Sequence, residues 1–253
     1  MRILLTGATG YIGQRLLPAL VQDGHEVICC VRNRKRFHPP DALRDRISVI
    51  EADFLDPDSL DQLPRQCDAV YYLIHSMSAD TEFRDMELRC ARNFRAAMEG
   101  RGVEQVIYLS GIVNEEALSE HLASRRDVEN ELARGDHALT TLRAGIIIGS
   151  GSASFEIIRD LVEKLPVMIA PKWLNTRCQP IGIADVIAFL RGSLLNTATY
   201  GRNFDIGGPD VLTYKEMLLG FAKVRGLRRW IGVVPVMTPR LSSYWLYFIT
   251  STS

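Results

Sequence analysis

The order of apolar segments along this chain of 253 residues predicts an α/β fold built on a doubly wound parallel sheet. Short apolar runs alternate with longer amphipathic stretches, which is the pattern of strands joined by crossover helices. Most of the short runs are apolar at every position, as strands covered by helices on both faces must be. With 47% hydrophobic residues, a chain of this length forms a core without disulfide bonds.

Six segments in the first 150 residues have the length and composition of strands, and four longer segments between them have those of helices. The expected strands are Arg2–Thr6, Glu26–Val31, Ile47–Glu51, Ala69–Ile74, Gln105–Ser110 and Thr140–Arg143, which leads into Ala144–Ile148. The expected helices are Tyr11–Gln22, Pro57–Leu63, Thr81–Gly100 and Glu115–Leu132. Repeated strand–helix–strand units of this kind give parallel neighbours with right-handed crossovers.

The charge balance excludes several classes of protein. Thirty basic residues face thirty acidic ones, so the formal net charge is zero. This argues against nucleic acid or an anionic membrane as a partner recognised through the overall field. The apolar fraction is too high for a disordered chain, and glycine and proline show no fibrous excess.

The five cysteines form neither a CxxC pair nor a Cys/His metal spacing, so we expect buried thiols and no metal. Met1 and Arg2 lead directly into a strand, without the charged region and cleavage site of a secretory signal. No run approaches the roughly 18 apolar residues of a membrane span. We therefore expect a cytoplasmic protein without a transmembrane segment.

The first expected strand is followed by a glycine-rich turn that opens the first helix. Its sequence is Thr6-Gly7-Ala8-Thr9-Gly10-Tyr11-Ile12-Gly13, or G-x-x-G-x-x-G. Gly7 permits a tight turn, Gly10 lets the backbone approach a pyrophosphate, and Gly13 lets the helix pack close to the strand. The helix amino terminus adds N–H groups and a partial positive charge. This turn predicts a Rossmann-type fold that binds a dinucleotide through Gly7, Thr9, Gly10, Tyr11, Ile12 and Gly13; the alternative is a turn with the same glycines and no ligand.

This motif resembles the extended and atypical branches of the short-chain dehydrogenase/reductase superfamily, and other segments agree over about residues 1–225. The agreeing stretches are Ala52–Asp56 (ADFLD), Leu142–Gly151 (LRAGIIIGSG), Pro180–Val186 (PIGIADV) and Gly207–Pro209 (GGP). The resemblance implies that Asp53 and Phe54 lie by the adenine, and it also assigns Leu73, Ile74 and Ala144 to the cofactor site. An alternative for Asp53 is an N-cap run before the helix at Pro57.

The end of the second strand indicates which dinucleotide is bound. Proteins of this fold that prefer NAD carry an acidic side chain there, which binds the ribose hydroxyls. Here the strand is followed by Arg32-Asn33-Arg34-Lys35-Arg36. A guanidinium binds a 2′-phosphate, which an acidic group would repel. We therefore expect NADP(H) rather than NAD(H), with Arg32 as the main contact and Arg34 or Arg36 as a helper; the alternative is a solvated basic loop.

Four residues are candidates for catalysis. In the family that the chain resembles, a serine ends the fifth strand and a Tyr-x-x-x-Lys pair follows on the next helix. Ser110 stands at the serine position, but His121 and Arg125 stand where the pair would be. His121 could transfer a proton, whereas Arg125 keeps its proton and could bind ribose hydroxyls. His75 follows the fourth strand at the same sheet edge.

Each candidate has a plainer interpretation. His121 and Arg125, four residues apart on one helix face, could be an exposed pair. His75 could be a loop histidine that caps local backbone. Tyr72 and Tyr108 lie inside expected strands, and we expect them in the core.

The missing Tyr-x-x-x-Lys pair leaves two functions open. One is an NADP(H)-dependent oxidoreductase on a small apolar substrate of unknown identity, with Ser110, His75 and His121 near the pocket. The other is a non-catalytic nucleotide-binding sensor or assembly module, as in nitrogen-metabolite-repressor-type regulators and the accessory subunit of mitochondrial complex I. The chain also resembles a bacterial group in which such a domain precedes a domain of unknown function.

The second half of the sequence is less regular than the first. We expect a dinucleotide-binding core over residues 1–150 and a small C-terminal cap or substrate region over 151–239. The chain should return to the core near 181–190. Residues 240–253 are apolar (RLSSYWLYFITSTS) and could dock on the body, form an oligomer contact or lead into a further domain.

Overall fold

The computed structural model describes residues 1–75, 81–112 and 120–234, with the backbone alone for residues 81–83 and 120–122. It divides into two compact units. Unit 1 comprises Met1–Ala144 and Ala184–Ile206, and unit 2 comprises Gly145–Ile183 and the chain from Gly207 onward. The apolar tail over 240–253 lies outside the described residues.

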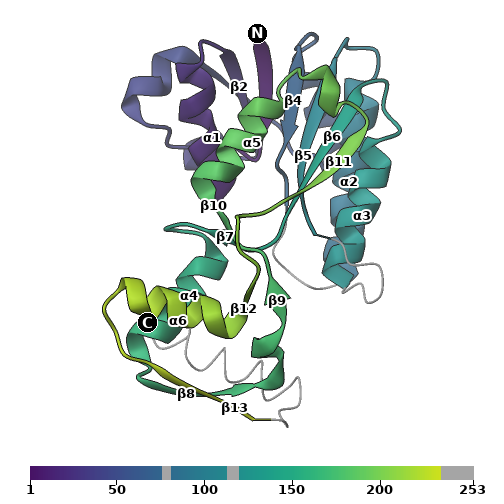
Figure 1. Ribbon diagram of the computed structural model, residues 1–253. Helices are drawn as coiled ribbons and strands as arrows, with labels where there is room; N and C mark the ends of the chain where they lie inside the picture. The colour runs from purple at the N-terminus through teal and green to yellow at the C-terminus, as the bar shows by residue number, and fades with distance from the viewer. Residues whose placement is uncertain (76–80, 113–119, 235–253) are drawn as a thin grey trace. The chain divides into compact units, whose positions relative to one another are not determined.

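Unit 1 is built on a seven-stranded sheet whose neighbouring strands all run parallel (Figure 1). The order across the sheet is β11-β6-β5-β4-β1-β2-β3. The strands are β1 (Arg2–Thr6), β2 (Glu26–Val31), β3 (Ile47–Glu51), β4 (Ala69–Tyr72), β5 (Gln105–Gly111), β6 (Ala138–Ala144) and β11 (Arg202–Ile206). The predicted Rossmann-type, doubly wound parallel sheet is confirmed.

Strand β1 is central because the chain winds away from it in both directions. Strands β2 and β3 follow on one side, and β4, β5 and β6 follow on the other. The crossovers therefore diverge between β1 and β4, which is the topological switch point of the sheet. Ligands of open α/β sheets bind at such a point, which directs attention to the residues after Thr6 and Tyr72.

Helices cover both faces of this sheet (Figure 1). They are α1 (Tyr11–Gln22), α2 (Thr81–Met98), α3 (Glu120–Leu132) and α5 (Ile183–Ser193). Neighbouring residues of β4 show which helix covers which face. The Tyr72 ring packs against Phe94 of α2, with 5.0 Å between centroids, whereas the Tyr71 hydroxyl donates to the carbonyl of Leu190 in α5 at 3.0 Å. Successive side chains of a strand point to opposite faces, so α2 and α5 lie on opposite sides.

Several elements differ from the sequence-based expectation. The segment from Pro57 forms a 3₁₀ helix, η3 (Pro57–Gln62), and short 3₁₀ turns also occur at η1 (Arg34–Arg36), η2 (Asp41–Arg46) and η5 (Thr197–Thr199). Strand β11 was not predicted. The start of the expected helix at Glu115 lies outside the described residues, and α3 is described from Glu120.

Unit 2 has a small core between two helices and a two-stranded sheet. The helices are α4 (Ala153–Lys164) and α6 (Tyr214–Val224), with η4 (Lys172–Asn175) beside them. The strand pairs are β8 (Val167–Pro171) with β13 (Trp230–Val234), β7 (Ile147–Ile148) with β10 (Ile181–Gly182), and β9 (Arg177–Cys178) with β12 (Leu212–Thr213). Strand β10 thus pairs inside unit 2, and the chain re-enters unit 1 with helix α5.

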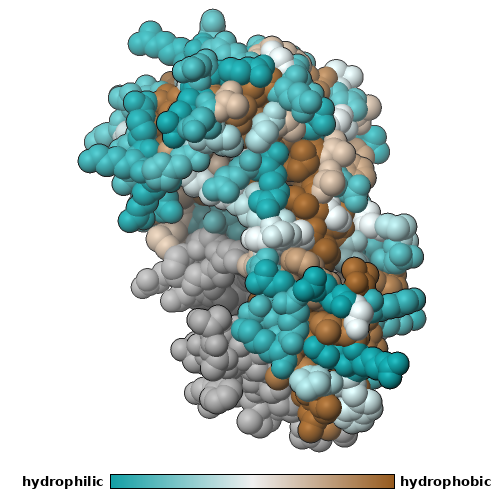
Figure 2. Space-filling model, turned by 90° about the vertical axis from the view of Figure 1, so that its left-hand side faces the viewer, coloured by the Kyte–Doolittle hydropathy of each residue, from teal (hydrophilic) through white to brown (hydrophobic). Residues whose placement is uncertain are grey.

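Apolar side chains also lie on the surface of unit 2. Figure 2 shows hydrophobic residues among hydrophilic ones on the face in view. Among the described residues of this unit, the large exposed hydrophobic ones are Ile157, Val167, Ile169, Trp173, Val211, Val224 and Trp230. Over the part of the chain that is described, no helix is long and apolar enough to cross a membrane.

Candidate nucleotide-binding and active site

Gly7 turns the chain from β1 toward helix α1 in a left-handed conformation, with a φ of 65°. A Cβ atom at this position would lie 2.5 Å from the carbonyl oxygen of Leu73, the first residue after β4. The Gly7 carbonyl accepts a hydrogen bond from the N–H of Gly10 at 2.9 Å, which closes the turn. Glycine alone satisfies both the backbone conformation and the close approach.

Gly13 brings the first turn of α1 against this loop. A Cβ atom on Gly13 would lie 2.3 Å from the carbonyl oxygen of Gly7 and 2.9 Å from the Cα atom of Ala8. Any side chain here would push the helix away from the turn. The two glycines together therefore set where the amino terminus of α1 stands relative to the sheet edge.

The amino terminus of α1 is suited to an anion. The helix opens at Gly10 without a side-chain cap and without an acidic residue in its first turn. Its first N–H groups point out of the helix and carry partial positive charge. Thr9 and Gly10 are exposed at this end, followed by the half-buried Tyr11 and Ile12. This glycine-lined cradle fits the pyrophosphate of a dinucleotide.

Thr6 fixes the glycine turn to the segment after β4. Its hydroxyl donates to the carbonyl of Tyr71 at 3.0 Å and accepts from the N–H of Leu73 at 3.1 Å. Thr6 is fully buried, so these bonds form without competition from water. Leu73, and Ile74 after it, are thereby held beside Gly7 at the carboxyl edge of the sheet.

The basic residues after β2 have different surroundings. Arg32 is exposed directly after the strand. The backbone N–H of Arg34 donates to the Glu51 carboxylate at 2.7 Å, and its guanidinium donates to the carbonyl of Val49. Arg34 is therefore anchored to strand β3, whereas Arg32 stands at the strand end where a ribose phosphate would be bound.

Asp53 and Phe54 lie in the turn after β3. Asp53 Oδ1 accepts from the N–H of Leu55 at 3.0 Å, so part of this carboxylate serves the turn itself. The Phe54 ring is buried beside Tyr72 and Phe94, with centroid distances of 6.4 and 5.9 Å. A ring inside the core cannot stack on an adenine, so only the backbone of Phe54 and the carboxylate of Asp53 stay candidate contacts.

The thiol of Cys90 in α2 relates Arg32 to Asp53. Burial raises the pKa of this thiol to about 11, with a further rise from the Asp53 carboxylate and an opposing effect of the Arg32 guanidinium. A charged side chain shifts the pKa of a thiol in this way only when it lies close to that thiol. Arg32 and Asp53 follow β2 and β3, two paired parallel strands, so both lie at the same edge of the sheet.

His75 belongs to a hydrogen-bonded group on the same sheet edge. Its Nδ1 atom lies 2.9 Å from Glu87 Oε1 of helix α2. The other carboxylate oxygen, Glu87 Oε2, accepts from the hydroxyl of Ser124 in α3 at 2.5 Å. The Glu87 side chain is 10% exposed and the His75 side chain 22%. His75 is therefore not a loop residue that only caps backbone.

Ser110 lies near the end of β5 with two other polar groups beside it. The Ser110 hydroxyl, the Tyr108 hydroxyl and Nε of Arg125 are all buried and complete no hydrogen bond within the described part of the chain. Burial raises the pKa of Tyr108, although the Arg125 guanidinium and the Ser110 hydroxyl lie near enough to oppose that rise. Buried polar groups are nearly always satisfied, so this cluster needs an explanation.

Three other predicted residues, Arg125, Ala144 and His121, have fewer described contacts. Arg125 Nη1 donates to the carbonyl of Leu109 at 3.2 Å, which draws the guanidinium to the end of β5. Ala144 is buried at the carboxyl end of β6, and its carbonyl accepts from the N–H of Ile112 at 3.2 Å. His121 belongs to the first turn of α3, but its side chain lies outside what is described.

Two residues of this edge were not predicted as functional from the sequence. Glu87 shares a helix face with Cys90, Ala91 and Phe94, all of which are buried. A carboxylate in an otherwise apolar helix stripe was a signal that could have been noticed. Tyr108 was expected in the core, and its ring is there, but nothing in the sequence shows that its hydroxyl lies beside Arg125.

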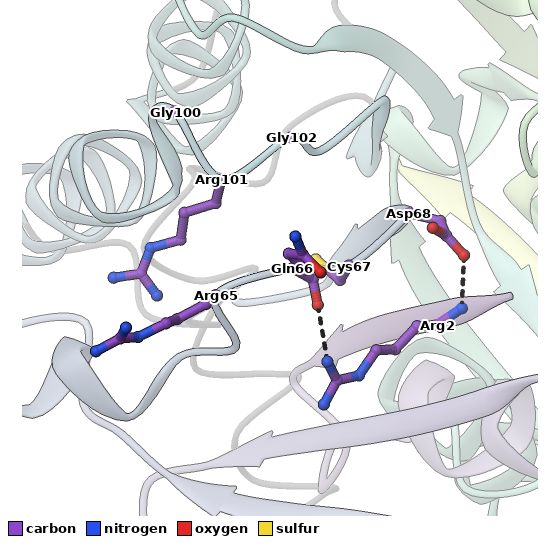
Figure 3. Close-up of a pocket in the computed structure, with 8 residues that line it drawn as sticks. All are labelled: Arg2, Arg65, Gln66, Cys67, Asp68, Gly100, Arg101 and Gly102. Atoms are coloured by element: carbon purple, nitrogen blue, oxygen red, sulfur yellow. Dashed lines mark hydrogen bonds between the residues drawn. The ribbon is translucent and has the colours of Figure 1, made fainter.

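The cavity of about 410 Å³ drawn in Figure 3 lies at the opposite edge of unit 1. Its lining comes from the amino-terminal ends of β1, β4 and β5 and includes three arginines. Arg2 and Arg101 are engaged by the protein, since Arg2 Nε donates to Glu26 and Arg101 Nη1 donates to the carbonyl of Leu63. Because this cavity lies at the amino-terminal ends of the strands, it is separate from the glycine turn, which follows the carboxyl end of β1. Among the described residues no His, Cys, Asp and Glu side chains are grouped to hold a metal ion.

Comparisons with known proteins agree with this geometry. The profile of the NAD(P)H-binding family matches residues 7–160, which is more than half of the chain. A ceramide reductase from Caulobacter vibrioides is 28% identical over 89% of this chain and 71% of its own length. A chloroplastic divinyl chlorophyllide a 8-vinyl-reductase from Zea mays is 26% identical over 82% of this chain and 55% of its own length.

Solved structures share the fold. A short-chain dehydrogenase/reductase superfamily protein from Agrobacterium tumefaciens, solved with bound NAD, superposes with a TM-score of 0.73 at 16% identity. The alignment covers 93% of this chain and 85% of that protein. The reductases among the relatives do not favour a non-catalytic module. The chain belongs to the NAD(P)H-binding family, and it shares its fold with a protein of the short-chain dehydrogenase/reductase superfamily.

Proposed function

We propose that this protein is an NADP(H)-dependent reductase that acts on a C=O group or an activated C=C group of a small apolar substrate. One observation carries the proposal more than any other. The Ser110 hydroxyl is buried at the end of β5 beside Arg125 and lacks a hydrogen-bond partner in the described residues. It lies at the sheet edge where ligands of this fold bind. A polar group left unsatisfied there is available to a ligand.

The cofactor would be held by residues of unit 1. Gly7, Thr9, Gly10, Tyr11, Ile12 and Gly13 would cradle the pyrophosphate at the start of α1. Asp53 and the backbone of Phe54 would face the adenine, and Leu73, Ile74 and Ala144 would line the nicotinamide side. When bound, the reduced nicotinamide supplies a hydride.

Arg32 supports a preference for NADP(H) over NAD(H). It is exposed at the end of β2, and residues 32–36 contain no acidic side chain. Arg32 would contact the 2′-phosphate directly. Arg34 would help mainly through its charge, because its guanidinium already donates to the carbonyl of Val49.

Three side chains would act on the substrate. Ser110 would donate a hydrogen bond to a substrate oxygen, and the nearby Arg125 cation would stabilise negative charge that develops there. His75 would supply the proton that follows the hydride, because imidazole can donate at neutral pH. His121 is a second proton donor to test, since it occupies the position of the missing tyrosine.

The apolar nature of the substrate is inferred from the relatives. The named proteins reduce a ceramide and a divinyl chlorophyllide. This supports a carbon-centred reduction on a largely apolar molecule, and it supports testing both carbonyl compounds and conjugated alkenes.

The test is NADPH oxidation by the purified chain with a panel of apolar ketones, aldehydes and enones. We expect turnover with at least one compound. Ser110→Ala and His75→Ala should lower kcat by roughly 10²-fold or more if they carry the hydrogen bond and the proton. His121→Ala is measured alongside, and Ser48→Ala, an exposed serine of β3, is the matched control.

Two outcomes would count against the proposal. Turnover that is unchanged in Ser110→Ala, His75→Ala and His121→Ala would remove the assigned site. Tight NADPH binding without turnover across the whole panel would remove the reductase and favour a nucleotide sensor.

A further inference from the structure

The Glu87 carboxylate connects three segments at the carboxyl edge of the sheet in unit 1. Glu87 belongs to α2, His75 follows β4, and Ser124 belongs to α3. Glu87 Oε1 lies 2.9 Å from His75 Nδ1, and Glu87 Oε2 accepts from the Ser124 hydroxyl at 2.5 Å. Each oxygen therefore has a different partner, and the carboxylate bridges the two helices and the sheet edge.

The Glu87 carboxylate is unusual because it is largely buried. The Glu87 side chain is 10% exposed, and Ser124 is 3% exposed. A carboxylate taken out of water is costly unless hydrogen bonds replace its hydration. This buried carboxylate stands on a helix face whose other residues, such as Ala91 and Phe94, pack into the core. An apolar residue would serve packing better, which indicates that Glu87 has a task beyond packing.

The chemistry of the pair dictates the state of His75. An ionised carboxylate only accepts hydrogen bonds, so Nδ1 of His75 must carry the hydrogen that lies between them. In the neutral ring Nε2 is then the basic nitrogen, and in the charged ring Glu87 stabilises the cation. The same carboxylate would thus fix one tautomer and support the imidazolium.

Other ionisable groups surround this bridge. Burial raises the pKa of Tyr72 in β4 and of Tyr108 in β5, and the negative charge of Glu87 raises both further. Cys90, on the same helix, responds to Glu87 in the same direction. From α3, Arg125 acts on Tyr108 with the opposite sign.

We propose that Glu87 is a positioning residue that holds His75 in its Nδ1–H tautomer at the carboxyl edge of the sheet, with Ser124 fixing the carboxylate from helix α3. The role of His75 in proton transfer rests on the proposed reductase function. The tautomer and the bridge stand on the geometry alone, so the two can be tested separately.

The experiment is ¹⁵N NMR of the full chain labelled at its histidines, with the His75 signals assigned by His75→Gln. In the wild type we expect the shifts of a single Nδ1–H tautomer at His75. In Glu87→Gln we expect a mixture of tautomers, because an amide can both donate and accept. Glu99→Gln, at an exposed glutamate just past the end of α2, is the matched control and should leave the spectrum unchanged.

Kinetics on the same variants separate positioning from cofactor binding. Glu87→Gln should lower kcat roughly 10- to 100-fold and leave the NADPH dissociation constant within about twofold. Ser124→Ala removes the bond from helix α3 to the carboxylate and should give a smaller fall in kcat with a partial mixture of tautomers. It also serves as the second variant if Glu87→Gln folds poorly by circular dichroism.

The outcomes distinguish this inference from the proposed function. A His75 tautomer that is the same in wild type, Glu87→Gln and Ser124→Ala overturns the role of Glu87, even if the protein is a reductase. A wild type that never turns over, but whose tautomer changes in Glu87→Gln, overturns the reductase and leaves the bridge established.

Discussion

Gly13 shows how the absence of a side chain shapes the cofactor turn. The nearest backbone atom to its missing Cβ is the Gly7 carbonyl oxygen, at 2.3 Å, and backbone cannot yield as a flexible side chain can. An added methyl must therefore move helix α1 or distort the turn. Both changes would shift the N–H groups that we assign to the pyrophosphate.

Gly13→Ala is expected to lower the free energy of unfolding by about 1–3 kcal/mol and to weaken NADPH binding. Gly192→Ala is the control, because Gly192 lies in helix α5 with nothing within 4 Å of its missing Cβ. That substitution should stabilise the protein by up to about 1 kcal/mol, since alanine favours a helix. Urea unfolding and a fluorescence titration with NADPH measure both effects. Equal behaviour of the two variants would refute the packing argument.

The sequence reveals single residues of the site only where spacing alone fixes their place. The glycines could be predicted because their positions relative to the first strand and helix determine their task. The place of Ser110 could be predicted because it stands near the end of the fifth strand, at the carboxyl edge of the sheet, and its role stays a prediction. The hydrogen bonds of Glu87 could not be predicted, because its partners His75 and Ser124 lie 12 and 37 residues away along the chain and meet it only in the fold.

Helix α3 is followed by a buried histidine whose titration is expected to make the stability of unit 1 depend on pH. His137 follows the helix, and its Nε2 atom lies 3.0 Å from the carbonyl of Leu132. Burial lowers the pKa of His137 below its ordinary value of 6.5, although the Leu132 carbonyl opposes this. The unfolded chain therefore takes up a proton at a higher pH than the folded chain does. Stability rises with pH through this window and falls as the pH drops below about 6.5.

His137→Gln should lose less stability than the wild type when the pH falls from about 7.5 to about 5.5. The glutamine can keep a hydrogen bond to Leu132 but cannot titrate. Urea unfolding at both pH values measures the difference, with the exposed His38→Gln as the control. The same loss in wild type and His137→Gln would show that another group sets the pH dependence.

Elements with strong periodic patterns could be predicted, and short ones could not. Strands β1, β2 and β3 and helix α1 begin and end where the apolar runs do. Strand β11 was missed because its residues, Arg202–Ile206, are mostly exposed at the edge of the sheet, so they show no apolar run. The segment from Pro57 could not be distinguished as 3₁₀ rather than α, because both begin with the same capping residues.

The two units differ in how far the sequence determines them. In unit 1 most connections return the chain to a parallel neighbour, whereas the one from β3 to β4 crosses to the other side of β1, so the order of segments nearly fixes the sheet. In unit 2 two of the three strand pairs have only two residues in each strand. Such strands carry no period that could be recognised, and their pairing depends on contacts between distant segments.

The net charge of the whole chain is zero, but positive charge is concentrated after β2, where four of the five residues 32–36 are basic. A single phosphate distinguishes NADPH from NADH, and Arg32 is the residue that we place against it. Arg32→Ala should weaken NADPH binding by roughly 1.5–3 kcal/mol, which is the loss expected for a hydrogen bond between charged groups. NADH binding should change little.

The most direct test of the whole account is a calorimetric titration of the full chain with NADPH and with NADH, repeated on Arg32→Ala. We predict saturable binding of one NADPH per chain that is tighter than NADH in the wild type, with the difference lost in the variant. Equal affinity for the two dinucleotides would contradict the assigned preference, and no binding of either would contradict the central claim that this glycine turn holds a nicotinamide dinucleotide.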